Sequence, residues 1–132
     1  MRPGRTFVVF VAVAALVVAG VAIARGLGER FAHGSDRGEF PVASAAGRTH
    51  DPHAIFAKVT TRPRHLEIAG KFRTNCAKLT SSGTRGNRVH GRAPVRKKLR
   101  LRFSNPDVCD ASVTAQMGGT GRIKVELFAK PQ

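Results

Sequence analysis

Residues 64–76 read RHLEIAGKFRTNC, and this stretch decides the fold class. Apolar or small side chains occupy every second position, from Leu66 through Phe72 to Cys76, and most positions between them are charged or polar. A period of two is typical of a β-strand with one face in a core and the other in water. We therefore predict a half-buried strand here.

Two other stretches continue this pattern. Residues 95–103 alternate apolar residues with Arg or Lys, and only Lys97 breaks the order, so this is the clearest strand in the sequence. A weaker strand is expected at residues 54–61. Before residue 95, the chain has no apolar period and indicates a flexible loop that carries Arg85, Arg88, His90 and Arg92.

The last part of the chain predicts a hairpin. Residues 109–117 and residues 123–127 each keep one apolar face, and residues 118–121 between them are rich in glycine. About five strands without a helical period predict an all-β domain. We expect a small antiparallel β-sandwich, for which an immunoglobulin-like arrangement is one candidate, or an open barrel.

The N-terminus differs from the rest of the chain. Residues 7–24, FVVFVAVAALVVAGVAIA, contain no charged or hydrogen-bonding side chain. As a helix they would extend about 27 Å, close to a hydrocarbon core of about 30 Å. Residues 1–24 are therefore expected to be a signal-anchor or a signal peptide. The length of the run favours a retained anchor, while Ala22-Ile23-Ala24 leaves cleavage near Ala24 and secretion as the alternative.

Between this segment and the predicted strands, the composition changes again. Residues 25–53 are rich in Gly, Ala, Ser and charge and show no sustained period. They are expected to form a flexible stalk. Residues 54–132 would then be the basic β domain.

The two cysteines predict a disulfide. Cys76 and Cys109 each lie in phase with the buried residues of their own predicted strands, so they can meet inside the core. Such a bridge favours an oxidising compartment, with the domain on the outer side of the membrane. Two buried free thiols in a cytosolic domain are the competing interpretation.

The charge of the protein is strongly positive. The net charge is +15, and residues 50–132 account for most of it, with 17 Lys and Arg against five acids. Such a surface attracts anionic lipid, wall polymers or nucleic acid alike. The absence of Trp and Tyr disfavours nucleic acid, since stacking on bases would rely on Phe alone.

The candidate anion-binding residues lie on one predicted strand. Alternate positions would aim four cations in one direction along residues 95–103. They are Arg96, Lys98, Arg100 and Arg102, which we call the cationic stripe. The competing interpretation is an edge strand whose charges prevent association between sheets.

Residues for catalysis or metal binding are few. His50, Asp51 and His53 have a spacing suited to two metal ligands, but nothing supplies a third. Asp107 and Asp110 flank Cys109 and are expected to serve the backbone of a turn. We therefore predict no catalytic residue, no metal and no cofactor.

Together these features favour a non-catalytic envelope module that is anchored in a membrane or exported. Its basic β domain would bind anionic lipid, wall polymer or an envelope protein. A nucleic-acid-binding domain held at a membrane is one alternative. A small exported enzyme or metal carrier is the other.

Overall fold

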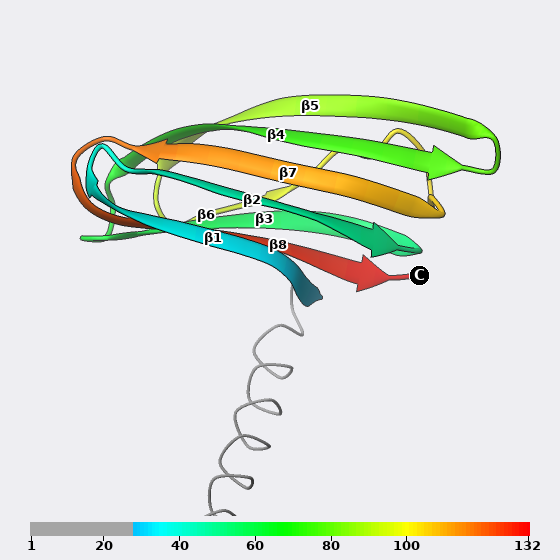
Figure 1. The fold of residues 1–132 in the computed structure, drawn as a ribbon, viewed down its shortest axis with the longest axis horizontal. Coiled ribbons are helices and arrows are strands. Elements are labelled where there is room, and N and C mark those ends of the chain that lie inside the picture. The colour runs from blue at the N-terminus through cyan, green and yellow to red at the C-terminus, as the bar shows by residue number, and fades with distance from the viewer. Residues whose placement is uncertain (1–27) are drawn as a thin grey trace, which may run out of the picture.

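The computed structural model describes residues 28–132, which form eight β-strands (Figure 1). The strands are β1 (Glu29–Glu39), β2 (Val42–His50), β3 (Pro52–Arg62), β4 (Glu67–Lys78), β5 (Ser81–Arg92), β6 (Val95–Lys98), β7 (Val108–Met117) and β8 (Thr120–Pro131). Within this range no helix is long and apolar enough to cross a bilayer. The predicted membrane segment, residues 7–24, lies outside it.

The strands form two stacked antiparallel sheets with the core between them (Figure 1). Sheet A has the order β1-β8-β3-β6, and sheet B has the order β2-β7-β4-β5. This is the strand order of a jelly roll, in which successive strands mostly alternate between sheets. The prediction of an all-β antiparallel sandwich is confirmed. The predicted number of strands is wrong, and the order differs from that of an immunoglobulin domain or an open barrel.

The first two strands correct the predicted stalk. In the part of residues 25–53 that the structure describes, β1 pairs with β8 and β2 pairs with β7, so this region belongs to the folded domain. The two strands approach each other closely, because a Cβ on Gly34 would collide with the carbonyl group of Ser44. Ala43 and Ala45 are the buried residues of β2 and keep the same gap narrow. The close contact of β1 with β2 therefore requires small residues at these positions.

The last two strands lie near their predicted positions, but they do not form a hairpin. β7 belongs to sheet B and β8 to sheet A, so the turn at residues 118–119 crosses from one sheet to the other. Alternation identifies the buried face of a strand but does not tell which sheet the strand joins. Both apolar faces point into the same core from opposite sides.

The predicted loop before residue 95 is also corrected. It forms β5, which pairs with β4 along its whole length and is an edge of sheet B. Val89 is the one buried apolar side chain of β5. An edge strand with one polar-rich inner face carries no hydrophobic period, which explains why the sequence pattern indicated a loop.

The strand predicted at residues 95–103 is shorter in the structure. β6 ends at Lys98, and the chain then enters the gap between the sheets. There the Leu99 N–H donates to the Ile55 carbonyl (2.8 Å), and the buried Thr74 hydroxyl donates to the Arg100 carbonyl (2.7 Å). Leu99 is buried, so this segment fills the side of the core that the short edge strand leaves open.

Candidate anion-binding surface

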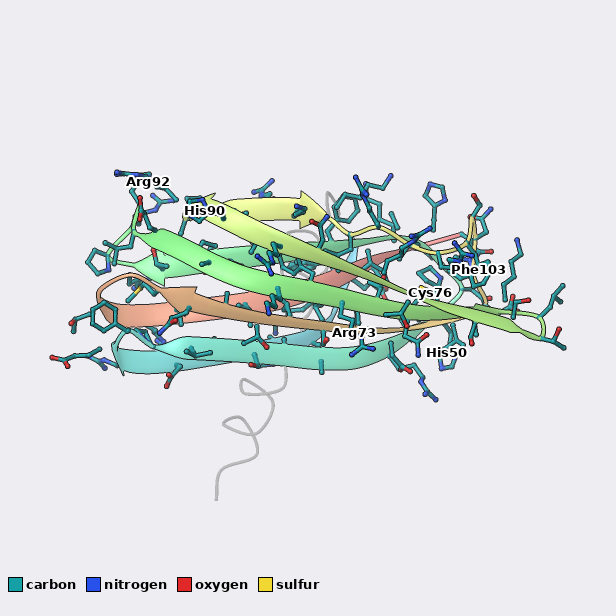
Figure 2. All side chains as sticks on the ribbon, turned by 90° about the horizontal axis from the view of Figure 1, so that it is seen from above. His50, Arg73, Cys76, His90, Arg92 and Phe103 are labelled. Atoms are coloured by element: carbon teal, nitrogen blue, oxygen red, sulfur yellow. A yellow bond between two sulfur atoms is a disulfide. The ribbon has the colours of Figure 1, made fainter. Side chains whose placement is uncertain are left out.

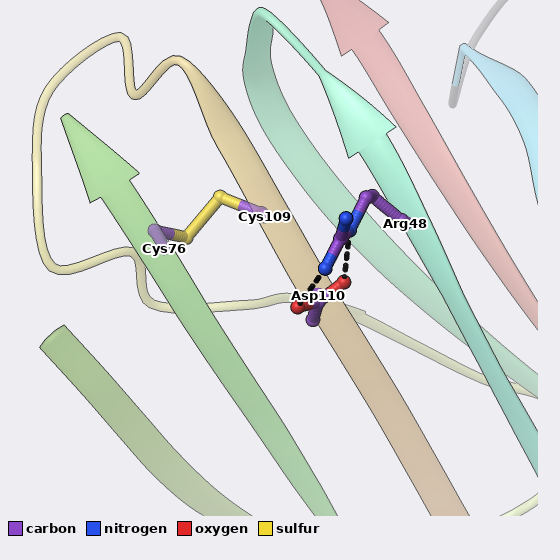
Figure 3. A network of polar contacts seen from close by, with 4 residues as sticks. All are labelled: Arg48, Cys76, Cys109 and Asp110. Atoms are coloured by element: carbon purple, nitrogen blue, oxygen red, sulfur yellow. Dashed lines mark hydrogen bonds and ion pairs between the residues drawn. A yellow bond between two sulfur atoms is a disulfide. The ribbon is translucent and has the colours of Figure 1, made fainter. Parts of the chain in front are cut away.

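The predicted disulfide is confirmed. Cys76 on β4 and Cys109 on β7 are directly opposite each other in sheet B, with Cα atoms 4.1 Å apart (Figure 3). Both are buried, as their phase in the two strands predicted. The bridge joins neighbouring strands of one sheet, so it stabilises sheet B and does not link the two sheets.

The two aspartates that flank Cys109 have structural partners. Asp110 accepts two hydrogen bonds from Arg48 on β2, at 2.8 and 3.1 Å (Figure 3). This hydrogen-bonded pairing lowers the pKa of the Asp110 carboxyl and raises the pKa of Arg48. Asp107 accepts a hydrogen bond from the backbone N–H of Leu79 at 2.7 Å and so fixes the turn between β4 and β5.

The histidines near the start of β3 are exposed at the surface. A ring nitrogen of His53 lies 3.3 Å from the side-chain oxygen of Asn105. Among residues 28–132 no three His, Cys, Asp or Glu side chains come together as a metal site would require. In Figure 2 His50 lies towards the end of the molecule opposite Arg92.

The residues of the cationic stripe are all exposed, but they do not share one strand. Arg96 and Lys98 lie on β6, the edge of sheet A, and Arg100 and Arg102 lie on the irregular segment after it. Lys98 and Arg100 line one hollow of about 740 Å³ together with Arg85. The aliphatic part of Arg102 instead lies over Gly83 of β5.

A second basic region on the outer face of sheet A was not predicted. It is a groove of about 950 Å³, which we call the sheet A groove. Its charged lining consists of Lys58, Arg62, Arg64, Arg122, Lys124 and Glu126. Alternation around Ile123 and Val125 did indicate that Arg122 and Lys124 face outward. The pairing of β8 with β3, which brings these residues beside Lys58 and Arg62, depends on the long-range fold and left no local signal.

No protein-family model matches the sequence, and a search of curated proteins finds no match. Among solved structures, a complex of TmCBM61 with β-1,4-galactotriose is 11% identical with a TM-score of 0.41, and the match covers 73% of this chain and 67% of that chain. The mitogen from Yersinia pseudotuberculosis is 6% identical with a TM-score of 0.41, covering 76% and 84%. The carbohydrate-binding module CBM28, specific for non-crystalline cellulose, is 12% identical with a TM-score of 0.37, covering 73% of each chain. At these values the likeness says nothing about the ligand of this chain.

Proposed function

We propose that this protein is a non-catalytic envelope module whose basic β-sandwich binds anionic polymers or lipids of the cell surface. The sandwich would stand on the outer side of a membrane, held there by residues 7–24, or be secreted after cleavage near Ala24. Binding would be largely electrostatic, with exposed Arg and Lys side chains contacting anionic groups directly.

The excess of positive charge on the surface carries this proposal. Residues 28–132 contain 20 Lys and Arg against eight Asp and Glu, a net charge of +12. None of these charged side chains is buried in the described part of the chain. Within it only three ion pairs form, and two of them share Glu126. Most of the cations are therefore open to a ligand.

The disulfide supports the proposed compartment. Disulfides form and persist in oxidising environments and are rare in the cytosol. Combined with an apolar segment long enough to span a bilayer, the bridge between Cys76 and Cys109 favours an outer location. Labelling of intact cells with a membrane-impermeant lysine reagent tests it. Labelled Lys71, Lys97 and Lys130 are expected, whereas labelling only after lysis would place the domain inside.

Salt-dependent binding tests the proposed activity. Full-length protein should bind anionic vesicles or isolated wall polymer at low salt, and the affinity should fall steeply towards physiological salt. Replacing the cationic stripe by Gln should weaken binding to anionic vesicles by up to about 4 kcal/mol, at about 1 kcal/mol for each cation near a membrane surface. The proposal fails if the wild-type protein binds no polyanion at low salt.

A further inference from the structure

The sheet A groove has the composition of a site for anionic groups. Five cations line it, and Glu126 is its one carboxylate. That carboxylate is already engaged, because Glu126 lies 3.3 Å from Arg30 and 4.0 Å from Lys124, and its side chain is only 13% exposed. The cations of the groove therefore greatly exceed the negative charge available to them within the described chain.

Three arginines stand in one row across the outer face of sheet A. Arg37 on β1 and Arg62 on β3 are both directly opposite Arg122 on β8. Directly opposite residues in antiparallel strands have Cβ atoms about 4.5–5.5 Å apart, and like charges in such pairs are destabilising. Among the ion pairs of residues 28–132, none involves these three arginines. An unbalanced row of this kind is stabilised when an anion lies across it.

A partly buried hydrogen bond holds the end of the groove in place. Thr61 is 5% exposed, and its hydroxyl donates to the Pro63 carbonyl at 2.8 Å. Pro63 and Arg64 follow β3 directly and line the groove at the start of the loop to β4. The loop that carries Arg64 is therefore anchored before any ligand arrives, which lowers the entropic cost of binding.

The groove is suited to phosphate and not to flat apolar ligands. Its lining includes no Phe, and His33 supplies the one aromatic ring among the lining residues, so the groove lacks the series of aromatic side chains on which successive bases or sugar rings would stack. Its hydrogen-bond donors include the guanidinium and ammonium groups of the lining Arg and Lys side chains. Ser35 and Thr60 add hydroxyl groups. Guanidinium groups bind phosphate oxygens through two parallel hydrogen bonds.

The spacing of the cations fits a chain of anionic groups. Neighbouring strands lie about 4.8 Å apart, and alternate residues of one strand about 6.8 Å apart, so successive cations can contact successive phosphates. We propose that the sheet A groove binds a linear polymer of phosphate groups. Inorganic polyphosphate and a polyol-phosphate wall polymer share this chemistry. This inference rests on the proposed function and assigns it a site that differs from the cationic stripe.

Two variants with equal charge test the site. The groove variant combines Arg62→Gln, Arg122→Gln and Lys124→Gln. The control variant combines Lys71→Gln, Arg73→Gln and Arg88→Gln, which removes three outward cations from sheet B, where Figure 2 shows Arg73. Each full-length protein is titrated in detergent with inorganic polyphosphate and, separately, with a polyol-phosphate polymer, over a series of salt concentrations.

The groove variant should bind at least one polymer roughly a hundredfold more weakly than the wild-type protein, about fivefold for each cation. The slope of log affinity against log salt should become shallower by roughly two to three. The control variant should keep most of the affinity. The polymer that binds the wild-type protein more tightly identifies the source of the phosphate groups. Should the groove variant fold poorly, Arg122→Gln alone is compared with Arg73→Gln alone.

Several results would overturn this assignment. Equal losses in both variants would mean that binding follows total charge, which leaves the proposed function intact without a groove site. If the affinity for both polymers fell only when the cationic stripe was replaced, the binding site would be the stripe and not the groove. Tighter binding of single-stranded DNA than of either polymer would identify a nucleic acid as the ligand and overturn the assignment to a phosphate polymer without bases. A wild-type protein that binds no polyanion would reject the proposed function as well.

Discussion

Arg122 shows how a single residue can favour binding at the expense of stability. It stands between Arg37 and Arg62 in one cross-strand row, so its charge is repelled from both sides. Arg73 on sheet B is its natural comparison, because its cross-strand neighbours are Ser112 and Gly86 and carry no charge. Both arginines point outward from an inner strand of their sheet. They differ in their cross-strand neighbours, which are charged for Arg122 and uncharged for Arg73.

We expect Arg122→Gln to raise the free energy of unfolding in the absence of polyanion. The gain should be about 0.2–1 kcal/mol, because each like-charged pair that is removed destabilises the folded sheet. Denaturant unfolding at low and high salt measures it, and the gain should shrink as salt screens the repulsion. The control, Arg73→Gln, should change little. A loss of stability in Arg122→Gln that salt does not affect would contradict the argument.

At the scale of a strand, Gly34 decides whether β1 can lie against β2. Gly34→Ala would push a methyl group into the carbonyl of Ser44, and we expect a loss of about 1–3 kcal/mol, the usual cost of overpacking. Gly86→Ala on β5 is the control, since its Cβ would lie 3.8 Å from the nearest atom, the Phe72 carbonyl oxygen. Thermal unfolding compares them. Equal effects would show that the two strands do not need this close contact.

The disulfide acts on the pairing of β4 with β7. Cys76 and Cys109 are 33 positions apart, and the chain-entropy model gives about 3–4 kcal/mol for a loop of about this length. We expect the double variant Cys76→Ala and Cys109→Ala to lose a free energy of unfolding of this size. Denaturant unfolding of the oxidised wild-type protein and the variant provides the comparison. A difference below about 1 kcal/mol would show that the bridge is not a main source of stability.

The elements also show how far the sequence alone could predict the fold. Alternation located β3, β4, β7 and β8 and the phase of both cysteines, because a half-buried strand must separate apolar from polar side chains. It missed β1, β2 and β5. Ala43, Ala45 and Gly34 are small because two edges close on each other, and β5 buries little besides Val89. These three edge strands therefore carried no apolar period, whereas β6, the remaining edge strand, did.

The candidate site could be predicted only in part, for a related reason. The exposed stripe at Arg96 and Lys98 was visible because its charges alternate within one local stretch. The sheet A groove depends on residues from β3 and β8, which the crossing turn at residues 118–119 places side by side. A hairpin, as first predicted, would have paired β8 with β7 instead. The groove therefore depends on the pairing of β8 with β3, two strands far apart in the sequence. The pattern of residues within either strand does not reveal it.

For the molecule as a whole, the sandwich presents two basic outer faces of different character. The outer face of sheet A holds the groove and its row of arginines. The outer face of sheet B has a smaller hollow of about 510 Å³, lined by Arg73 and by Arg48, which is paired with Asp110. A net charge of +12 on a domain of this size attracts polyanions to every side. The position at which a phosphate polymer binds therefore distinguishes a groove site from attraction by total charge.

A map of amide chemical shifts for isotope-labelled full-length protein with inorganic polyphosphate tests this most directly. We predict that the largest shifts fall on β3 and β8 around Arg62, Arg122 and Lys124, with small shifts around Lys71 and Arg73 on sheet B. The shifts should diminish together as salt is raised, since the contacts are electrostatic. Shifts spread evenly over both outer faces, or largest on sheet B, would contradict a phosphate site in the sheet A groove.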